Sequence, residues 1–177
     1  MKFHSGSWLP LAFGLLLAPV GHALAAQVTY AGVVTRVVDG DTVWLKTPAL
    51  GQPLKVRLSG IDAPEICQTG GVQARDALVG RVLGQQVTLK SRAHDDYGRT
   101  LGTVYLNGQD INRWLVTNGH AWVYRFRQKK PLYSEDFAQA RAARRGLFSD
   151  VEALDPRAFR KAYGSCPDTK KRPSSYR

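Results

Sequence analysis

The chain is short of histidine, cysteine and acidic residues, and it has no long uninterrupted apolar run. Of its four histidines, only His94 and His120 lie beyond the N-terminal apolar segment, and its two cysteines allow at most one internal disulfide. Acidic residues number 14 against 25 basic ones, which gives a net charge of +11 and a pI near 10.0. Few side chains other than carboxylates and arginines are therefore available for covalent chemistry.

The N-terminal segment predicts an exported protein. Lys2 supplies a positive start, residues 8–20 are mostly apolar, and residues 23–25 (Ala-Leu-Ala) have the small-x-small pattern that signal peptidase reads. A transmembrane anchor is the alternative, but the apolar run is short for a span and is interrupted by two prolines and a glycine. We expect residues 1–26 to be a signal peptide and the mature protein to be periplasmic or secreted, without stable membrane insertion.

The length leaves room for one sizeable core and little for a second domain. We expect a folded domain over residues 27–155 and a C-terminal extension over residues 156–177, which ends in a solvated basic tail. The positive charge favours polyanionic partners, because each neutralised phosphate releases condensed counterions. An anionic membrane surface, or solubility alone, is an alternative that charge does not exclude.

The pattern of apolar and turn residues predicts five strands and three helices. The fold class is α+β, a five-stranded OB-fold β-barrel with about three helices packed on it. The helices are expected over 72–83, after a capping Asp110, and from a capping Ser134 to Gly146. The strands are expected at 28–38, 42–45, 54–58, 87–91 and 101–106, with a brief extended piece at 121–126.

Carboxylates and arginines come together in three separated segments of the sequence: Asp41, then Arg57 with Asp62 and Glu65, then Arg99. Acidic oxygens suit a hard divalent cation. Arginine suits phosphate, because its planar guanidinium offers donors in a bidentate arrangement. A cation and two arginines around one point make a site for cleaving a phosphodiester.

Four segments, in their order along the chain, resemble the staphylococcal nuclease family. They are VDGDT at 38–42, the strand arginine at 57, DAPE at 62–65 and DYGR at 96–99. A lone Asp-Gly-Asp is weak, since many turns contain it, but the four segments together are specific. The similarity covers about residues 33–149, nearly the whole expected domain.

The resemblance implies an OB-fold nuclease that hydrolyses DNA and RNA with calcium. Asp41 and Asp62 would be the carboxylate ligands of the ion, together with the main-chain carbonyl of Thr42. Glu65 would position or deprotonate the attacking water. Two carboxylates leave several cation positions for water and substrate, as catalysis needs, and they do not exclude magnesium in place of calcium.

The resemblance also implies how the substrate is bound. Arg57 and Arg99 would hold the phosphate as charge builds on it, and Tyr97 would touch a phosphate oxygen. Two tyrosines that line the nucleotide pocket of the family's type member align with Arg125 and Arg127. Because arginine can stack on bases and bind phosphate, we expect stronger backbone binding with altered base preference. We expect the enzyme to be a monomer.

Three other functions stay open. The first is a non-catalytic OB-fold module that only binds nucleic acid, although such modules usually lose the carboxylates or arginines that are all present here. The second is a metal-independent ribonuclease that uses His94 and His120 as an acid–base pair. The third is a basic envelope protein with no chemistry.

Cys67 and Cys166 are favoured as a disulfide. An even pair of cysteines far apart in the sequence of an exported protein invites a bridge, because the compartment is oxidising. Two unrelated buried thiols are the alternative. The bridge would hold the C-terminal segment near the loop that follows Glu65.

Overall fold

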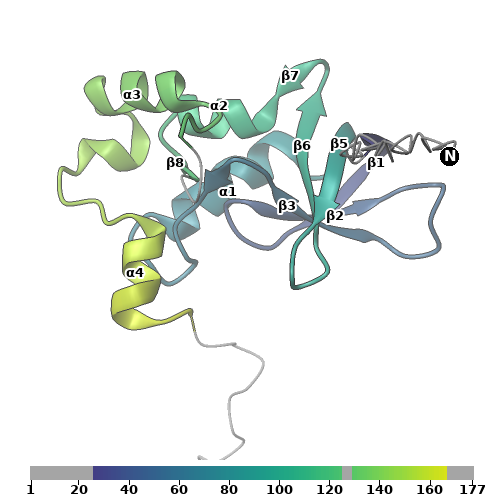
Figure 1. Cartoon of the computed structure of the whole chain (residues 1–177), viewed down its shortest axis with the longest axis horizontal. Helices are drawn as coiled ribbons and strands as arrows, with labels where there is room; N and C mark the ends of the chain where they lie inside the picture. Colours follow the sequence, from purple (N-terminus) through teal and green to yellow (C-terminus); the bar gives the residue numbers. More distant parts are fainter. Residues whose placement is uncertain (1–25, 125–128, 167–177) are drawn as a thin grey trace, which may run out of the picture.

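The architecture is a small β-barrel with helices on one side (Figure 1). The computed structural model describes residues 26–124 and 129–166. The signal-peptide prediction, Arg125, Arg127 and the basic tail lie outside the described residues. The long strands are β1 Val28–Val37, β2 Thr42–Lys46, β3 Leu54–Leu58, β5 Gln86–His94 and β6 Thr100–Leu106.

The five long strands close into a barrel. They follow the order β3-β2-β1-β5-β6 with antiparallel neighbours, and β3 also pairs with β6 in parallel, which joins the two ends. Alternate side chains point inward and are buried, as the period-two pattern requires: Val34, Val43, Leu45, Val56, Leu58, Val87, Leu89 and Val104. The predicted OB-fold is confirmed as a closed, mixed five-stranded barrel.

Short strands attach further segments to the barrel. β7 Gln109–Asp110 folds back and pairs with β6 in antiparallel fashion, while β4 Ile61–Asp62 pairs with β8 Trp122–Val123 in a separate two-stranded sheet. β8 is the extended piece that the sequence predicts. Because β4 directly follows β3, this second sheet places Asp62 at the edge of the barrel.

The described residues contain four α-helices, one more than the sequence predicts: α1 Gly71–Val82, α2 Ile111–Thr117, α3 Ser134–Ala142 and α4 Pro156–Tyr163. Asp110 caps α2, and its side chain accepts the N–H of Arg113. The expected cap of α3 is one residue off, because Tyr133 is the N-cap and Ser134 begins the helix. No helix in the described ranges is both long and apolar enough to cross a membrane.

α3 also ends earlier than predicted. It stops at Ala142, and Gly146 begins a separate 3-10 turn, η1 Gly146–Ser149. The positive φ of Arg144 and Gly146 breaks the helical path between the two elements. Phe148 of η1 packs edge-on against Trp122 and Phe137, which fastens this region to the core.

α4 is the main departure from the sequence analysis, which expects no element after residue 155. The helix projects beside the barrel (Figure 1), and Pro156 is its only buried residue. Two other contacts attach its flanks to the loop after β4. Cys67 and Cys166 form a disulfide, and Gln68 Nε2 donates to the carbonyl of Leu154 at 2.6 Å. Covalent and polar contacts therefore hold α4 in place more than apolar packing does.

Reduction of the bridge is expected to lower the melting temperature. The cysteines are 99 residues apart, and in the chain-entropy model such a loop contributes up to about 4.7 kcal/mol to the free energy of unfolding. Thermal unfolding with and without reductant measures the effect. The matched control is the Cys67→Ser/Cys166→Ser double variant, whose melting temperature should not respond to reductant. An unchanged wild-type melting temperature contradicts the prediction.

Candidate active site

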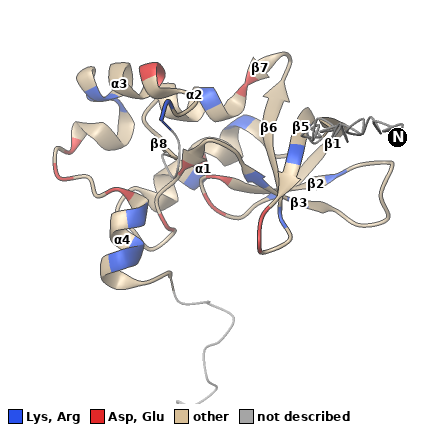
Figure 2. Cartoon of the chain, in the orientation of Figure 1, with Lys and Arg blue, Asp and Glu red and all other residues tan. Residues whose placement is uncertain are grey.

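One cleft of about 750 Å³ gathers the residues that the sequence singles out. It opens where the β1–β2 turn, β3, β4 and the β5–β6 loop meet, with α4 at its edge. Basic residues lie on α4 and on the barrel strands, and acidic residues lie in the loops between them (Figure 2). The lining includes these predicted site residues: Asp41, Arg57, Asp62, Glu65, Tyr97 and Arg99.

The β1–β2 turn fixes Asp41 at the base of the cleft. Asp39 forms the turn itself, and its side chain accepts the N–H of Asp41 at 3.0 Å. Gly40 brings the turn close to β4 and α1, because a Cβ there would lie 2.6 Å from Ala63 Cβ and 2.9 Å from Ala74 Cβ. Ala63 then donates its N–H to Asp41 Oδ2 at 2.7 Å, which ties the turn to the DAPE segment.

Arg57 joins the two aspartates. Its Nη2 donates to Asp62 Oδ1 at 2.9 Å, and its Nη1 forms an ion pair with Asp41 Oδ2. The side chains of Asp41 and Asp62 are only 8% and 6% exposed, so both carboxylates converge on one guanidinium in a largely dry place. Burial lowers the pKa of Arg57, but the two carboxylates outweigh it, and the net shift is upward.

The aspartate pair is a place where additional positive charge would be stabilised. Burial raises the pKa of Asp41 to about 8, and Asp39 and Asp62 add to the rise, although Arg57 opposes it. Carboxylate oxygens whose negative charge is only partly neutralised by neighbouring groups suit a hard divalent cation. The described residues contain no group of three or more ligating side chains, so such an ion would depend on two carboxylates and on water.

The burial of Asp41 predicts an unusual pH dependence of folding stability in the absence of metal. Because the folded-state pKa of Asp41 lies near 8 and its ordinary value is 3.8, the folded protein binds more protons than the unfolded chain between these values. Stability from this group therefore falls as pH rises from about 4 to about 8. In chelator at pH 8, Asp41→Asn should unfold at a higher temperature than wild type, with a gain of up to about 5 kcal/mol.

Thermal melts of wild type and Asp41→Asn at several pH values test the sign. The difference between them should shrink as pH falls towards 4, because the unfolded wild-type carboxyl then also begins to bind a proton. Asp76→Asn is the matched control, since it makes the same chemical change at an exposed carboxylate on α1 and leaves the surroundings of Asp41 unchanged. A variant that loses stability relative to wild type as pH rises contradicts the assignment.

Arg99 enters from the opposite side of the cleft. The side-chain Nε of Arg99 donates to Asp95 Oδ2 at 2.6 Å, and the main-chain N–H of Arg99 donates to Asp95 Oδ1 at 2.8 Å. Burial raises the pKa of Asp95, but these hydrogen bonds outweigh it and lower the pKa overall. Asp95 thus braces the loop, and within the described residues no hydrogen bond is found for either Nη of Arg99. Tyr97 is 83% exposed, with its ring 5.5 Å from the Arg99 guanidinium.

Three other residues considered from the sequence do not line the cleft. The Thr42 carbonyl accepts the N–H of Val38 at 2.8 Å inside the β1–β2 hairpin, and Thr42 does not line the cleft. The histidines of the ribonuclease alternative sit on separate elements away from the cleft lining. His94 ends β5 beside Thr100, and His120 packs on Trp114, where burial lowers its pKa.

Arg160 of α4 is the cleft residue that the sequence analysis misses. Its Nη2 donates to Asp62 Oδ2 at 2.7 Å, and its Nη1 donates to Glu65 Oε1 at 3.0 Å. The sequence does carry a signal for the helix that presents it. Asp155 accepts the N–H groups of residues 157 and 158 as N-cap, and Pro156 occupies the first helical position.

Comparison with known proteins gives the family. A model described as "Staphylococcal nuclease homologue" matches residues 55–150. The chain is 37% identical over 172 residues to "Protein ParB" of Escherichia coli, a match that covers 91% of this chain and 95% of that protein. It is also 37% identical over 152 residues to a "Micrococcal nuclease" of Shigella flexneri, with 79% and 86% covered. An "Uncharacterized endonuclease" of Escherichia coli O157:H7 is 35% identical, with 86% and 96% covered.

Fold, cleft and relatives agree. The closed OB-type barrel holds buried carboxylates and arginines in one open cleft, and several relatives over most of the chain are named as nucleases. The chain belongs to the staphylococcal nuclease family and is a nuclease, an enzyme that hydrolyses the phosphodiester bonds of nucleic acid.

Proposed function

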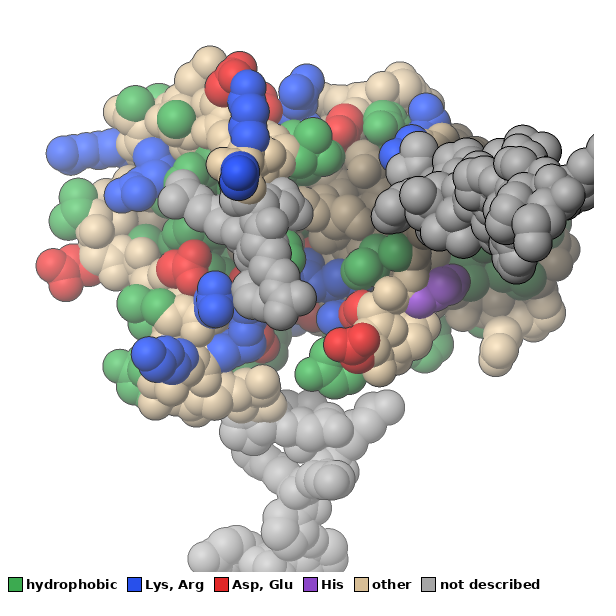
Figure 3. All heavy atoms as spheres, viewed as in Figure 1, with side chains coloured by type: hydrophobic (Ala, Val, Ile, Leu, Met, Phe, Trp, Pro, Cys, Tyr) green, Lys and Arg blue, Asp and Glu red, His purple; other side chains and the backbone are tan. Residues whose placement is uncertain are grey.

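We propose that the protein is a calcium-dependent nuclease that hydrolyses both DNA and RNA. The observation that carries the proposal is the meeting of acidic oxygens and guanidinium groups in a single cleft, from segments far apart in the sequence. Basic side chains over α3 and α4 add an electrostatic attraction for a polyanion on the face shown in Figure 3.

Asp41 and Asp62 are the residues that would hold the ion, with magnesium as the alternative to calcium. The ion would supply Lewis-acid polarisation of the phosphate oxygens. Affinity without substrate is expected to be weak, on the order of 10⁻⁴ to 10⁻³ M, because few protein ligands contribute. Thr42, the third ligand that the resemblance implies, would contribute its main-chain carbonyl, which accepts one bond from Val38 and has a second lone pair.

Glu65 is the proposed general base. Its side chain is 25% exposed, so it can reach both the cleft and solvent, and it lies three residues beyond Asp62. Its N–H donates to Gln68 Oε1 at 3.2 Å, which fixes the backbone from which the carboxylate projects. From this position Glu65 would orient a water and accept its proton as the water attacks phosphorus.

Arg57 and Arg99 would bind the phosphate from two sides. Arg57 is held by the aspartates and Arg99 by Asp95, so both guanidinium groups are positioned before substrate arrives. Such preorganised donors stabilise the charge that builds on the phosphate oxygens. Tyr97 would add a hydroxyl at the mouth of the cleft.

The test is the digestion of DNA and of RNA with calcium, with magnesium and with chelator. We expect cleavage of both with calcium and none with chelator. Glu65→Gln should abolish cleavage and retain binding, while Asp76→Asn, on the exposed face of α1, is the matched control. Binding without cleavage under every condition would instead favour the non-catalytic OB-fold module. Cleavage of RNA alone in chelator would favour the histidine ribonuclease.

The proposal has further parts that lie outside the described residues. Arg125 and Arg127 would bind the nucleic-acid backbone and alter base preference. Removal of residues 1–26 would release a monomeric enzyme into the periplasm or the medium. Sequencing the N-terminus of the mature protein, and measuring its mass in solution, tests these parts.

A further inference from the structure

Arg160 contacts the candidate catalytic carboxylates more fully than any other group from outside the barrel. Besides the bonds to Asp62 Oδ2 and Glu65 Oε1, its Nη1 also lies 3.3 Å from Asp62 Oδ1. Arg57 already bonds Asp62 Oδ1. Both oxygens of Asp62 are therefore engaged by arginine, and Glu65 is paired as well.

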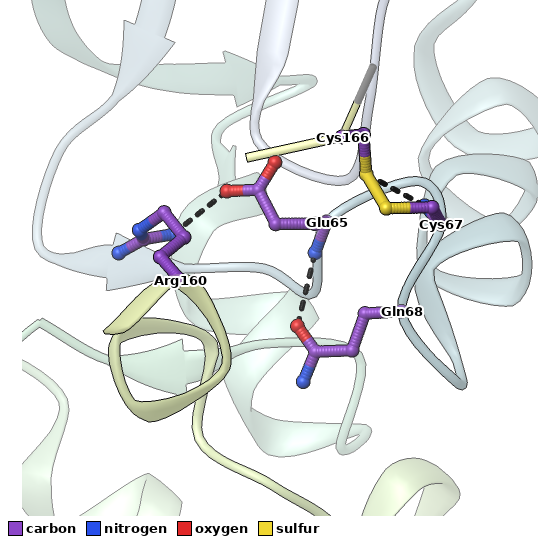
Figure 4. Close-up of a disulfide and its surroundings, with 5 residues drawn as sticks. All are labelled: Glu65, Cys67, Gln68, Arg160 and Cys166. Atoms are coloured by element: carbon purple, nitrogen blue, oxygen red, sulfur yellow. Dashed lines mark hydrogen bonds and ion pairs between the residues drawn. A yellow bond between two sulfur atoms is a disulfide. The ribbon is translucent and has the colours of Figure 1, made fainter. Parts of the chain in front are cut away.

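The segment around Arg160 is fastened to the loop that carries Glu65 (Figure 4). The disulfide joins Cys67, two residues after Glu65, to Cys166, six residues after Arg160. On the other side of α4, Gln68 bonds both the Glu65 N–H and the Leu154 carbonyl. Arg160 is thus held between two attachments, and Figure 4 shows its guanidinium turned towards the Glu65 carboxylate.

We infer that Arg160 is a tethered cation that binds Asp62 and Glu65 until a divalent ion displaces it. By competing with the ion for these carboxylates, Arg160 sets the metal affinity of this nuclease. The inference rests on the proposed metal site. The family match ends at residue 150, so it leaves Arg160 without a role.

The competition follows from the atoms involved. Asp62 Oδ1 accepts from Arg57 and Asp62 Oδ2 accepts from Arg160, so an ion bound by Asp62 competes with an arginine for a carboxylate oxygen. Arg160 also occupies Oε1 of Glu65, which leaves one oxygen of the proposed base for a water. The Arg160 side chain is 31% exposed at the cleft edge, so it can move away from the carboxylates without unfolding of the barrel.

The tether gives the arginine its advantage over ions in solution. A covalently attached group competes at an effective concentration that its linker sets, which for short linkers reaches the millimolar range. The affinity of the ion falls in proportion to the fraction of molecules in which the carboxylates are free. If Arg160 occupies them in about nine molecules out of ten, its removal tightens calcium binding about tenfold.

The experiment is calorimetric titration of calcium into the full-length mature protein, without nucleic acid. Arg160→Ala should lower the calcium Kd about tenfold, and Arg160→Lys should give an intermediate value, because lysine keeps the charge but not the planar fork. Lys161→Ala is the matched control, since it removes an exposed positive charge from the next position of α4 and should leave the Kd unchanged.

The tether is tested in the same titration. Cys67→Ser/Cys166→Ser should tighten calcium binding in the same direction, and adding Arg160→Ala to that background should then change little, since both act through one contact. An equal or weaker affinity in Arg160→Ala overturns the inference, as does an equal effect of Lys161→Ala. Cleavage by the wild type with calcium is measured separately, so the proposed function can stand where the inference fails.

Discussion

Arg99→Lys is expected to lower the rate of DNA cleavage at least about tenfold, and Arg99→Ala by about 10² to 10³-fold. Arg99 uses its Nε to hold Asp95 and presents the rest of its guanidinium to the cleft. The lysine side chain has one nitrogen. In this geometry it can keep the contact with Asp95 or bind the phosphate, but it cannot do both. The loss should appear in kcat, because the bonds strengthen as charge builds on the phosphate.

Steady-state kinetics on one defined substrate measure the effect. The matched control is Arg92→Lys, the same chemical change at an exposed position of β5 that does not line the cleft. This control should cleave at the wild-type rate. A loss below tenfold for Arg99→Lys would remove Arg99 from the phosphate site.

Arg57→Ala is expected to damage both activity and stability. Removing the guanidinium removes a hydrogen-bond donor to the negative charge that develops on the phosphate, which lowers the rate by about 10² to 10³-fold. It also leaves two buried carboxylates without their shared partner, which lowers the free energy of unfolding by about 3 kcal/mol at pH 8. Few single changes in this chain combine the two effects.

The stability loss of Arg57→Ala should depend on pH. Below pH 8 a growing fraction of Asp41 is protonated, and a protonated carboxyl needs no cation. The loss should therefore shrink towards pH 5, as seen by denaturant unfolding at both pH values in chelator. Lys55→Ala is the control for stability, since Lys55 is exposed on the same strand two residues away. A pH-independent loss contradicts the role given to Asp41.

Local sequence information is sufficient for the individual strands of the barrel, but it does not give their order. β-Branched runs with period-two alternation give the strands, and Asp39-Gly40 gives the turn that carries Asp41. Prediction is weaker where helices end, because end positions depend on local backbone conformations such as the left-handed Tyr133. α4 escapes the pattern because it is only eight residues long and buries only Pro156, so it gives periodicity little more than two helical turns to reveal.

The chemical character of the candidate site also comes from the sequence. Residue types and their order predict acidic ligands and two arginines, and the structure places all of them in one cleft. Their mutual pairing could not be predicted. In the sequence pattern, Arg57 falls on the polar face of its strand, as Lys55 does. Only the pairing of β3 with β2 and β6 directs the Arg57 side chain onto Asp41 and Asp62.

The sequence by itself determined the fold class, the family and the residue types at the cleft, because these depend on local patterns and on motifs that the chain carries whole. The tertiary structure decided what depends on distance in space. It buried Asp41 enough to raise its pKa, and it brought Arg160 to Asp62 and Glu65 across nearly a hundred residues of chain. Desolvation and ion pairing act between groups that folding brings together, so no local pattern reports them.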